Sequence, residues 1–170
     1  MREAAFERLY AENGEAIFNF LLYRTGDRGV AEDLAADTFE RVLRNRRPFD
    51  PRRGSERTWL YSIALNRLRD YLRRAEVEGR ALQRAESDAE RLGPSAGIHG
   101  GEHALEAVET KQTVLEALAV LSAEEREAVA LRYGADLTLA EAARVAGEPR
   151  TTLEGRTYRA LRKLRDELGG

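Results

Sequence analysis

Arginines and aromatic side chains are concentrated in residues 49–74, FDPRRGSERTWLYSIALNRLRDYLRR, which include the chain's only tryptophan, Trp59. Cations track the phosphates of a nucleic acid, and unpaired bases stack on aromatic rings with about 1–3 kcal/mol per base. Trp59 and Tyr61 fall near the start of a predicted helix, beside a loop that carries Arg52 and Arg53. This block therefore suits contact with single-stranded nucleic acid, and core packing is the alternative for Trp59.

Ser55 is suited to cap the helix that runs from this loop through Arg74 and beyond. Helical spacing divides the side chains into two sets. The apolar side carries Leu60, Ile63, Ala64, Leu68, Tyr71 and Leu72, and the polar face carries Ser62, Asn66, Arg69, Asp70 and Arg73. With Arg52, Arg53 and Trp59, this polar face forms the first candidate nucleic-acid surface.

A second candidate surface lies in residues 138–168, TLAEAARVAGEPRTTLEGRTYRALRKLRDEL. A short helix, a turn containing Gly147 and a longer basic helix give the layout of a helix-turn-helix, whose second helix presents its first residues to base edges. The candidate contacts on that helix are Arg150, Thr151, Thr152, Glu154, Gly155, Arg156, Tyr158, Arg159 and Arg162. An ordinary helical hairpin with a charged outer face is the alternative.

Glu154 has two interpretations. Thr151 and Glu154 have the T-x-x-E spacing of a capping box, in which the carboxylate bonds a backbone N–H group. A glutamate at this place can instead accept a hydrogen bond from cytosine. Both interpretations are open at the level of sequence.

The other elements are also predicted to be helices, because no stretch alternates with a period of two. Residues 3–25 predict two short helices broken near Asn13–Gly14. Residues 30–45 predict one helix with an apolar stripe, whose opposite face carries Asp33, Asp37, Glu40, Arg41 and Arg44. Ser122 with Glu125, and Thr138 with Glu141, have capping-box spacing and mark two further helix starts.

The predicted fold class is therefore all-α, with two small helical domains joined by a flexible linker. Residues 1–75 form the first domain, 76–104 the linker and 105–170 the second domain, because GPSAGIHGG at 93–101 cannot form a helix or a core. We expect the two domains to fold independently and to move relative to each other.

Charge and composition limit the function classes. Residues 41–74 hold eleven Lys and Arg against three Asp and Glu, although the whole chain has a net charge of −2. Two basic regions on an acidic chain indicate bipartite contact with a polyanion, with a solvated arginine-rich surface as the alternative. The chain has no cysteine, no apolar run of about 20 residues and no catalytic constellation, so we expect a soluble intracellular protein that is not an enzyme. No cofactor or metal site is expected, since Gly100 and Gly101 separate the two histidines, His99 and His103.

Three segments carry a family resemblance: AEDLAADTFERVLRN at 31–45, the block at 49–74 and the C-terminal helix-turn-helix. In this order and spacing they resemble the extracytoplasmic-function sigma factors of the sigma-70 family, which keep only the second and fourth sigma domains. The resemblance implies that the helix 31–45 docks on the clamp helices of the largest RNA polymerase subunit. It also implies that the block 49–74 opens and holds the minus-ten promoter element, and that the helix-turn-helix reads the minus-thirty-five element.

The function implied is a cytoplasmic sigma factor that binds core RNA polymerase and directs promoter-specific initiation, with an anti-sigma factor as a further partner. A sigma mimic that sequesters an anti-sigma protein is one alternative, but it is expected to lose the basic faces. A helix-turn-helix regulator is another, but it leaves the first domain unexplained. The chain departs from the family pattern at Ala36 (often Gln), Glu154 (Lys), Gly155 (Ser) and Thr157 (Leu).

Overall fold

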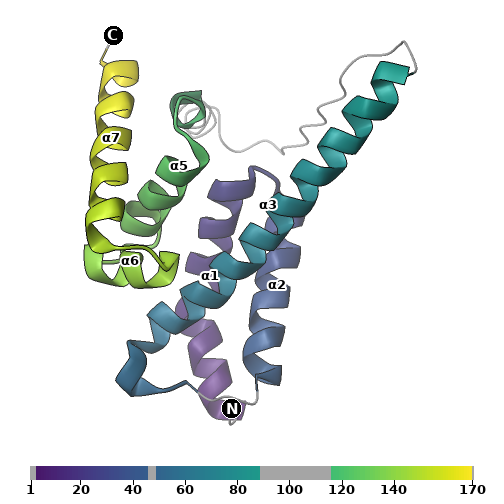
Figure 1. Ribbon diagram of the computed structural model, residues 1–170. Helices are drawn as coiled ribbons and strands as arrows, with labels where there is room; N and C mark the ends of the chain where they lie inside the picture. The colour runs from purple at the N-terminus through teal and green to yellow at the C-terminus, as the bar shows by residue number, and fades with distance from the viewer. Residues whose placement is uncertain (1–2, 46–48, 89–115, 170) are drawn as a thin grey trace, which may run out of the picture.

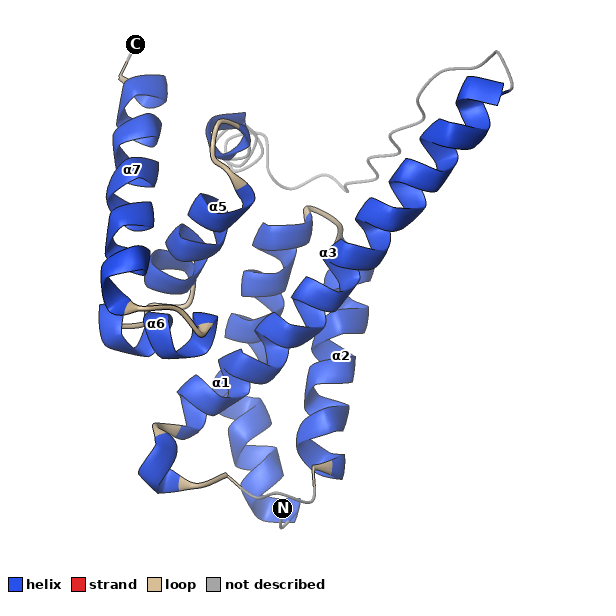
Figure 2. Cartoon of the chain, in the orientation of Figure 1, coloured by secondary structure: helices blue, strands red, loops and turns tan. Residues whose placement is uncertain are grey.

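The computed structural model describes residues 3–45, 49–88 and 116–169, and every regular element in these residues is a helix (Figure 2). The N-terminal group comprises α1 (Glu3–Thr25), α2 (Arg28–Arg44), the 3-10 turn η1 (Pro51–Arg53) and α3 (Glu56–Asp88). The C-terminal group comprises α5 (Ala123–Val129), the π-helical turn η2 (Ala130–Gly134), α6 (Leu139–Ala146) and α7 (Arg150–Leu168). The predicted all-α fold class is confirmed.

Helix α1 is continuous, so the predicted break at Asn13–Gly14 is wrong. The amide of Asn13 donates to the Leu9 carbonyl at 2.9 Å, one turn back, and thereby adds a bond inside the helix. Leu9, Ile17, Phe20 and Leu21 form one buried stripe that crosses the expected break. Burial of this stripe outweighs the weak helix propensity of Asn and Gly.

A tight turn at Gly26, with φ of +67°, joins α1 to α2. Asp27 caps α2 by accepting from the Val30 N–H at 3.0 Å. Phe39 and Val42 then face the core, and the buried Thr38 satisfies its hydroxyl on the Leu34 carbonyl at 2.7 Å. The outer face of α2 is left for charged side chains.

Ser55 caps α3 as predicted, because its hydroxyl accepts from the Thr58 N–H at 3.1 Å. Helix α3 crosses the first two helices, and its C-terminal part projects away from them (Figure 1). It continues to Asp88, past the boundary predicted at residue 75. Tyr61 is fully buried and packs edge-on against Phe20, with ring centroids 5.4 Å apart, so its ring cannot stack on a base.

The C-terminal group contains the predicted helix-turn-helix. Both capping boxes form, Ser122 with Glu125 at the start of α5 and Thr138 with Glu141 at the start of α6. Gly147 ends α6 in the left-handed conformation, with φ of +70°, which is strained for residues with a side chain. This turn sets the direction of α7.

The two groups pack against each other through one hydrophobic cluster, to which α1 and α3 contribute on one side and η2 and α6 on the other (Figure 1). Polar contacts surround the cluster. Arg69 of α3 bonds the Glu127 carboxylate at 2.6 and 3.2 Å and the Ala146 carbonyl at 3.0 Å, and Arg57 donates to the Ala135 carbonyl. The structure therefore departs from the expected independence of the two domains.

None of the helices described is both long and apolar enough to cross a membrane. Most of the predicted linker, together with His99 and His103, lies outside the described residues.

Candidate nucleic-acid and polymerase interface

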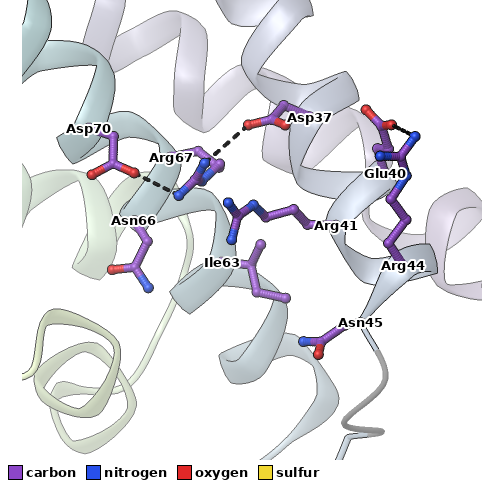
Figure 3. A pocket seen from close by; sticks show the side chains of 9 residues that line it. All are labelled: Asp37, Glu40, Arg41, Arg44, Asn45, Ile63, Asn66, Arg67 and Asp70. Atoms are coloured by element: carbon purple, nitrogen blue, oxygen red, sulfur yellow. Dashed lines mark hydrogen bonds and ion pairs between the residues drawn. The ribbon is translucent and has the colours of Figure 1, made fainter.

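A groove of about 730 Å³ runs between the outer face of α2 and the middle of α3 (Figure 3). Its lining includes Asp37, Glu40, Arg41 and Arg44 from α2, with Asn45, Ile63, Asn66, Arg67 and Asp70. The groove thus brings four of the five candidate polymerase-binding residues beside two candidates for the minus-ten element. The fifth, Asp33, is exposed on α2 and does not line the groove.

Ion pairs fix most of the charges in this groove. Arg67 lies 3.6 Å from Asp37 and 2.6 Å from Asp70, and it joins α2 to α3. Glu40 pairs with Arg44 at 2.6 Å on the surface of α2. Arg41 extends toward the groove and makes no ion pair or hydrogen bond with the described residues (Figure 3). Arg41 is therefore available to an anionic partner.

A second pocket, of about 380 Å³, lies where the loop before α3 meets the helix. Arg53, Trp59 and Ser62 line it, while Arg52 is exposed on η1 beside it. Trp59 is half-buried: it packs against the hydrophobic cluster, lies 6.0 Å from the Phe49 ring and also lines the pocket. Both interpretations of Trp59, core packing and an accessible ring surface, therefore fit its position.

The polar face predicted on α3 is divided in two. Asn66 and Asp70 face the groove, and Arg73 lies 3.6 Å from Asp70 near its edge. Arg69 turns instead toward the C-terminal group, where Glu127 is only 14% exposed. The hydrogen bonding that Arg69 donates to Glu127 is the main reason that the pKa of Arg69 is raised above its ordinary value.

Helix α7 presents six of its nine candidate residues to solvent: Arg150, Thr151, Glu154, Tyr158, Arg159 and Arg162. Thr152, Gly155 and Arg156 are half-buried, and Arg156 is held by Glu148 at 3.2 Å. Leu153, Thr157 and Ala160 are buried on the opposite side of the helix. The outward face is thus free to enter a groove of duplex DNA.

The capping-box interpretation of Glu154 is wrong. Helix α7 begins directly after Pro149, whose carbonyl accepts from the N–H groups of Thr152 and Leu153, both at 3.1 Å. No side chain caps this helix. Thr151 is the second residue of the helix, two positions too late to serve as its cap.

Glu125 anchors α7 to α5. It is 5% exposed, bonds the Ser122 N–H at 3.0 Å and Lys163 at 2.8 Å, and lies 3.9 Å from Arg159. The bond from Lys163, followed by that from Ser122, lowers the pKa of Glu125 below its ordinary value of 4.5. These contacts fix where the outward face of α7 points.

We expect Glu125→Gln to lower the free energy of unfolding by about 1 kcal/mol at neutral pH, because it removes a charge-assisted hydrogen bond. A carboxyl with a lowered folded pKa stabilises the protein above pH 4.5 and loses that contribution as the pH falls through the folded pKa. The difference between wild type and variant should therefore be constant above about pH 5.5 and shrink below pH 4.5. Urea unfolding at several pH values measures this difference in the free energy of unfolding. The control is Glu141→Gln, because Glu141 belongs to the capping box of α6 but pairs with no described Lys or Arg.

Sequence reasoning missed four residues that organise these sites: Arg57, Arg67, Glu127 and Arg144. Only Arg67 had a local signal, its spacing of three from Asp70. Arg144 of α6 reaches the loop pocket and donates to the Arg53 carbonyl at 3.3 Å. Gly54 has a φ of +141°, a backbone conformation that favours glycine, and a Cβ there would also make the Arg144 guanidinium, 2.9 Å away, shift.

Comparison with known proteins agrees with this architecture. The family model for Sigma-70 region 2 matches residues 9–77, and that for Sigma-70 region 4 matches residues 117–166. The ECF RNA polymerase sigma factor BldN of Streptomyces coelicolor is 30% identical over 162 residues, which cover 94% of this chain and 59% of BldN. The chain thus spans less than two thirds of that relative.

Two solved structures share the fold. The sigma factor RpoE of Bartonella quintana, in complex with the anti-sigma factor NepR, superposes with a TM-score of 0.74 at 24% identity, covering 97% of both chains. CnrH, in complex with the cytosolic domain of CnrY, gives a TM-score of 0.70 at 25% identity, covering 99% of this chain and 90% of CnrH. The chain belongs to the extracytoplasmic-function group of the sigma-70 family, whose members are non-enzymatic factors that direct transcription initiation.

Proposed function

We propose that this chain binds core RNA polymerase through the outer face of α2 and contacts both promoter elements, each with a different group of helices. The observation that carries the proposal is the presence, in one chain, of the α2–α3 groove, the loop pocket with Trp59 and the exposed face of α7. Each of these three sites has the charge and the exposure that binding to polymerase or DNA requires.

The loop pocket and the groove suit the opened minus-ten strand. Arg52 and Arg53 supply cations beside the accessible part of Trp59, the combination that binds phosphates and stacks bases in single-stranded nucleic acid. Asn66 lies further along α3 on the groove side and can hydrogen-bond to base edges. Arg69 can join this surface only if it leaves Glu127.

The outward face of α7 suits duplex DNA at the minus-thirty-five element. Arg150 and Arg162 are exposed and make no ion pair with described residues, so both can reach phosphates or guanines. An anti-sigma protein is a further partner that we propose by analogy of fold, since RpoE was solved with one.

The double variant Asp37→Lys with Glu40→Lys tests the polymerase-binding face. We expect it to bind core polymerase about tenfold more weakly, a loss of about 1.4 kcal/mol, because two carboxylates at the contact become cations. Fluorescence titration of labelled chain with core enzyme measures the dissociation constant.

The matched control is Asp166→Lys with Glu167→Lys, which makes the same charge change on exposed positions at the end of α7. Circular dichroism must show unchanged helicity, because Asp37 also pairs with Arg67. Wild-type affinity in the α2 double variant would place the polymerase contact on a different face.

A further inference from the structure

Glu154 is the first acidic residue of α7, and the next, Asp166, lies three turns further on. It stands among cations on the face expected to meet DNA: Arg150 one turn before it, and Arg159 and Arg162 after it. A carboxylate there is repelled by phosphates, so its presence calls for a compensating contact.

No described residue of the chain supplies this compensating contact for Glu154. Glu154 is exposed and makes no hydrogen bond or ion pair with any described residue. It does not cap α7, since the Pro149 carbonyl already accepts from the Thr152 and Leu153 N–H groups. Both carboxylate oxygens of Glu154 are therefore free to accept hydrogen bonds from a ligand.

The position of Glu154 on the helix is the one from which base edges are reached. It is the fifth residue of α7, and in a helix-turn-helix the N-terminal residues of the second helix contact bases in the major groove. Glu154 shares the outward face with Thr151 and with Tyr158, which is 67% exposed, while the buried Leu153 and Thr157 lie on the neighbouring side of the helix.

Base chemistry selects the ligand. A carboxylate only accepts hydrogen bonds, so it needs an exocyclic amino group, and the major groove offers two: cytosine N4 and adenine N6. Adenine also places its N7 acceptor beside that amino group, where it opposes a carboxylate, whereas cytosine presents the amino donor alone. Guanine and thymine offer the carboxylate no donor on this edge.

We propose that Glu154 makes this chain select a cytosine at one position of the duplex minus-thirty-five element. The inference rests on the proposed function and deepens it by naming the base. At this position Glu154 replaces the lysine of the family pattern.

The test is in vitro transcription by the holoenzyme from a promoter library whose minus-thirty-five element is randomised, with wild type compared with Glu154→Gln. Glutamine bonds N6 and N7 of adenine together, so the variant should change its preference at one position from cytosine toward adenine. We expect the cytosine-to-adenine ratio there to fall by about 5- to 150-fold, with preferences at the other positions retained.

Glu167→Gln is the matched control, because it removes the same charge from an exposed site at the far end of α7. The inference is overturned if wild type prefers no cytosine in the element, if Glu154→Gln keeps the wild-type profile, or if it changes output equally on all sequences. These outcomes leave the proposed function standing, provided that wild type still selects promoters. A wild-type holoenzyme with no promoter preference at all overturns both.

Discussion

A chain carrying Glu127→Arg should be more extended in solution than the wild-type chain. Glu127 holds Arg69 with two hydrogen bonds across the junction of the two helical groups, and Arg24 lies close enough to interact electrostatically with Glu127, Arg126 and Arg69. The substitution replaces the shared carboxylate by a further cation among these arginines. Removing one partner of a buried pair costs about 3–5 kcal/mol, and less here because Arg69 is about one third exposed.

Small-angle X-ray scattering measures the result as the radius of gyration. A compact chain of this length has a value of about 16 Å, and separation of the groups should raise it by several ångström. Glu124→Arg on the same helix is the control, because Glu124 is exposed and outside the junction. Combining Glu127→Arg with Arg69→Glu should restore the ion pair and much of the compactness, whereas a Glu127→Arg chain with wild-type dimensions would contradict this role of the pair.

This junction matters for the proposed function because the closed arrangement occupies part of the surface that we propose for the minus-ten element. Arg69 is bonded to Glu127, and Arg144 of α6 lies in the loop pocket. The two promoter elements are also about 25 base pairs apart, or about 85 Å at 3.4 Å per pair, far more than a compact chain of this length spans. We therefore expect the two groups to separate before both elements are bound.

Truncation of the cations on α7 and truncation of Trp59 should impair different steps of promoter binding. Arg150→Ala with Arg162→Ala removes two proposed duplex contacts, so it should weaken binding to closed promoter DNA by about tenfold or more and reduce the salt dependence of binding. On a template already melted at the minus-ten element, the same variant should act almost normally. Gel-shift titrations on both templates at several salt concentrations give the comparison, without heparin for closed complexes and with heparin for opened ones.

Trp59→Ala should leave closed-complex formation nearly intact and lower the yield of opened complexes, because one stacking surface is lost. Trp59 also packs against the core, so circular dichroism must show that the chain is folded. Arg52→Ala is a second test of the same surface that should not disturb folding, because Arg52 is exposed and outside the hydrophobic cluster. If pre-melting rescues the α7 variant no better than it rescues Trp59→Ala and Arg52→Ala, the assignment of duplex and single-strand roles is wrong.

The features that were predicted correctly from sequence depend on residues a few positions apart. The caps at Ser55, Ser122 and Thr138 each use a side chain three residues before its backbone partner, so the pattern is visible in the chain. Thr151 with Glu154 shows the limit of that rule. Pro149 starts α7 before the capping box can form, so the same pattern has a different structural role.

The junction between the groups could not be predicted, because its contacts join residues far apart in sequence. Arg57 and Ala135 are separated by 78 positions, and Arg144 and Arg53 by 91. Periodicity gives the buried face of a helix but not its partner, so it could not show that apolar residues of η2 and α6 pack against α1 and α3. Tyr61 was expected near the nucleic-acid surface because it follows the loop with Arg52 and Arg53, but the structure buries it beside Phe20.

In vitro transcription with purified core polymerase and the wild-type chain, with the 5′ ends of the products mapped, tests the central claim most directly. The account predicts transcripts that start at defined positions only when the chain is present. Mutation of either promoter element upstream of those positions should abolish them. Transcripts that are independent of the chain, or of both promoter elements, would contradict it.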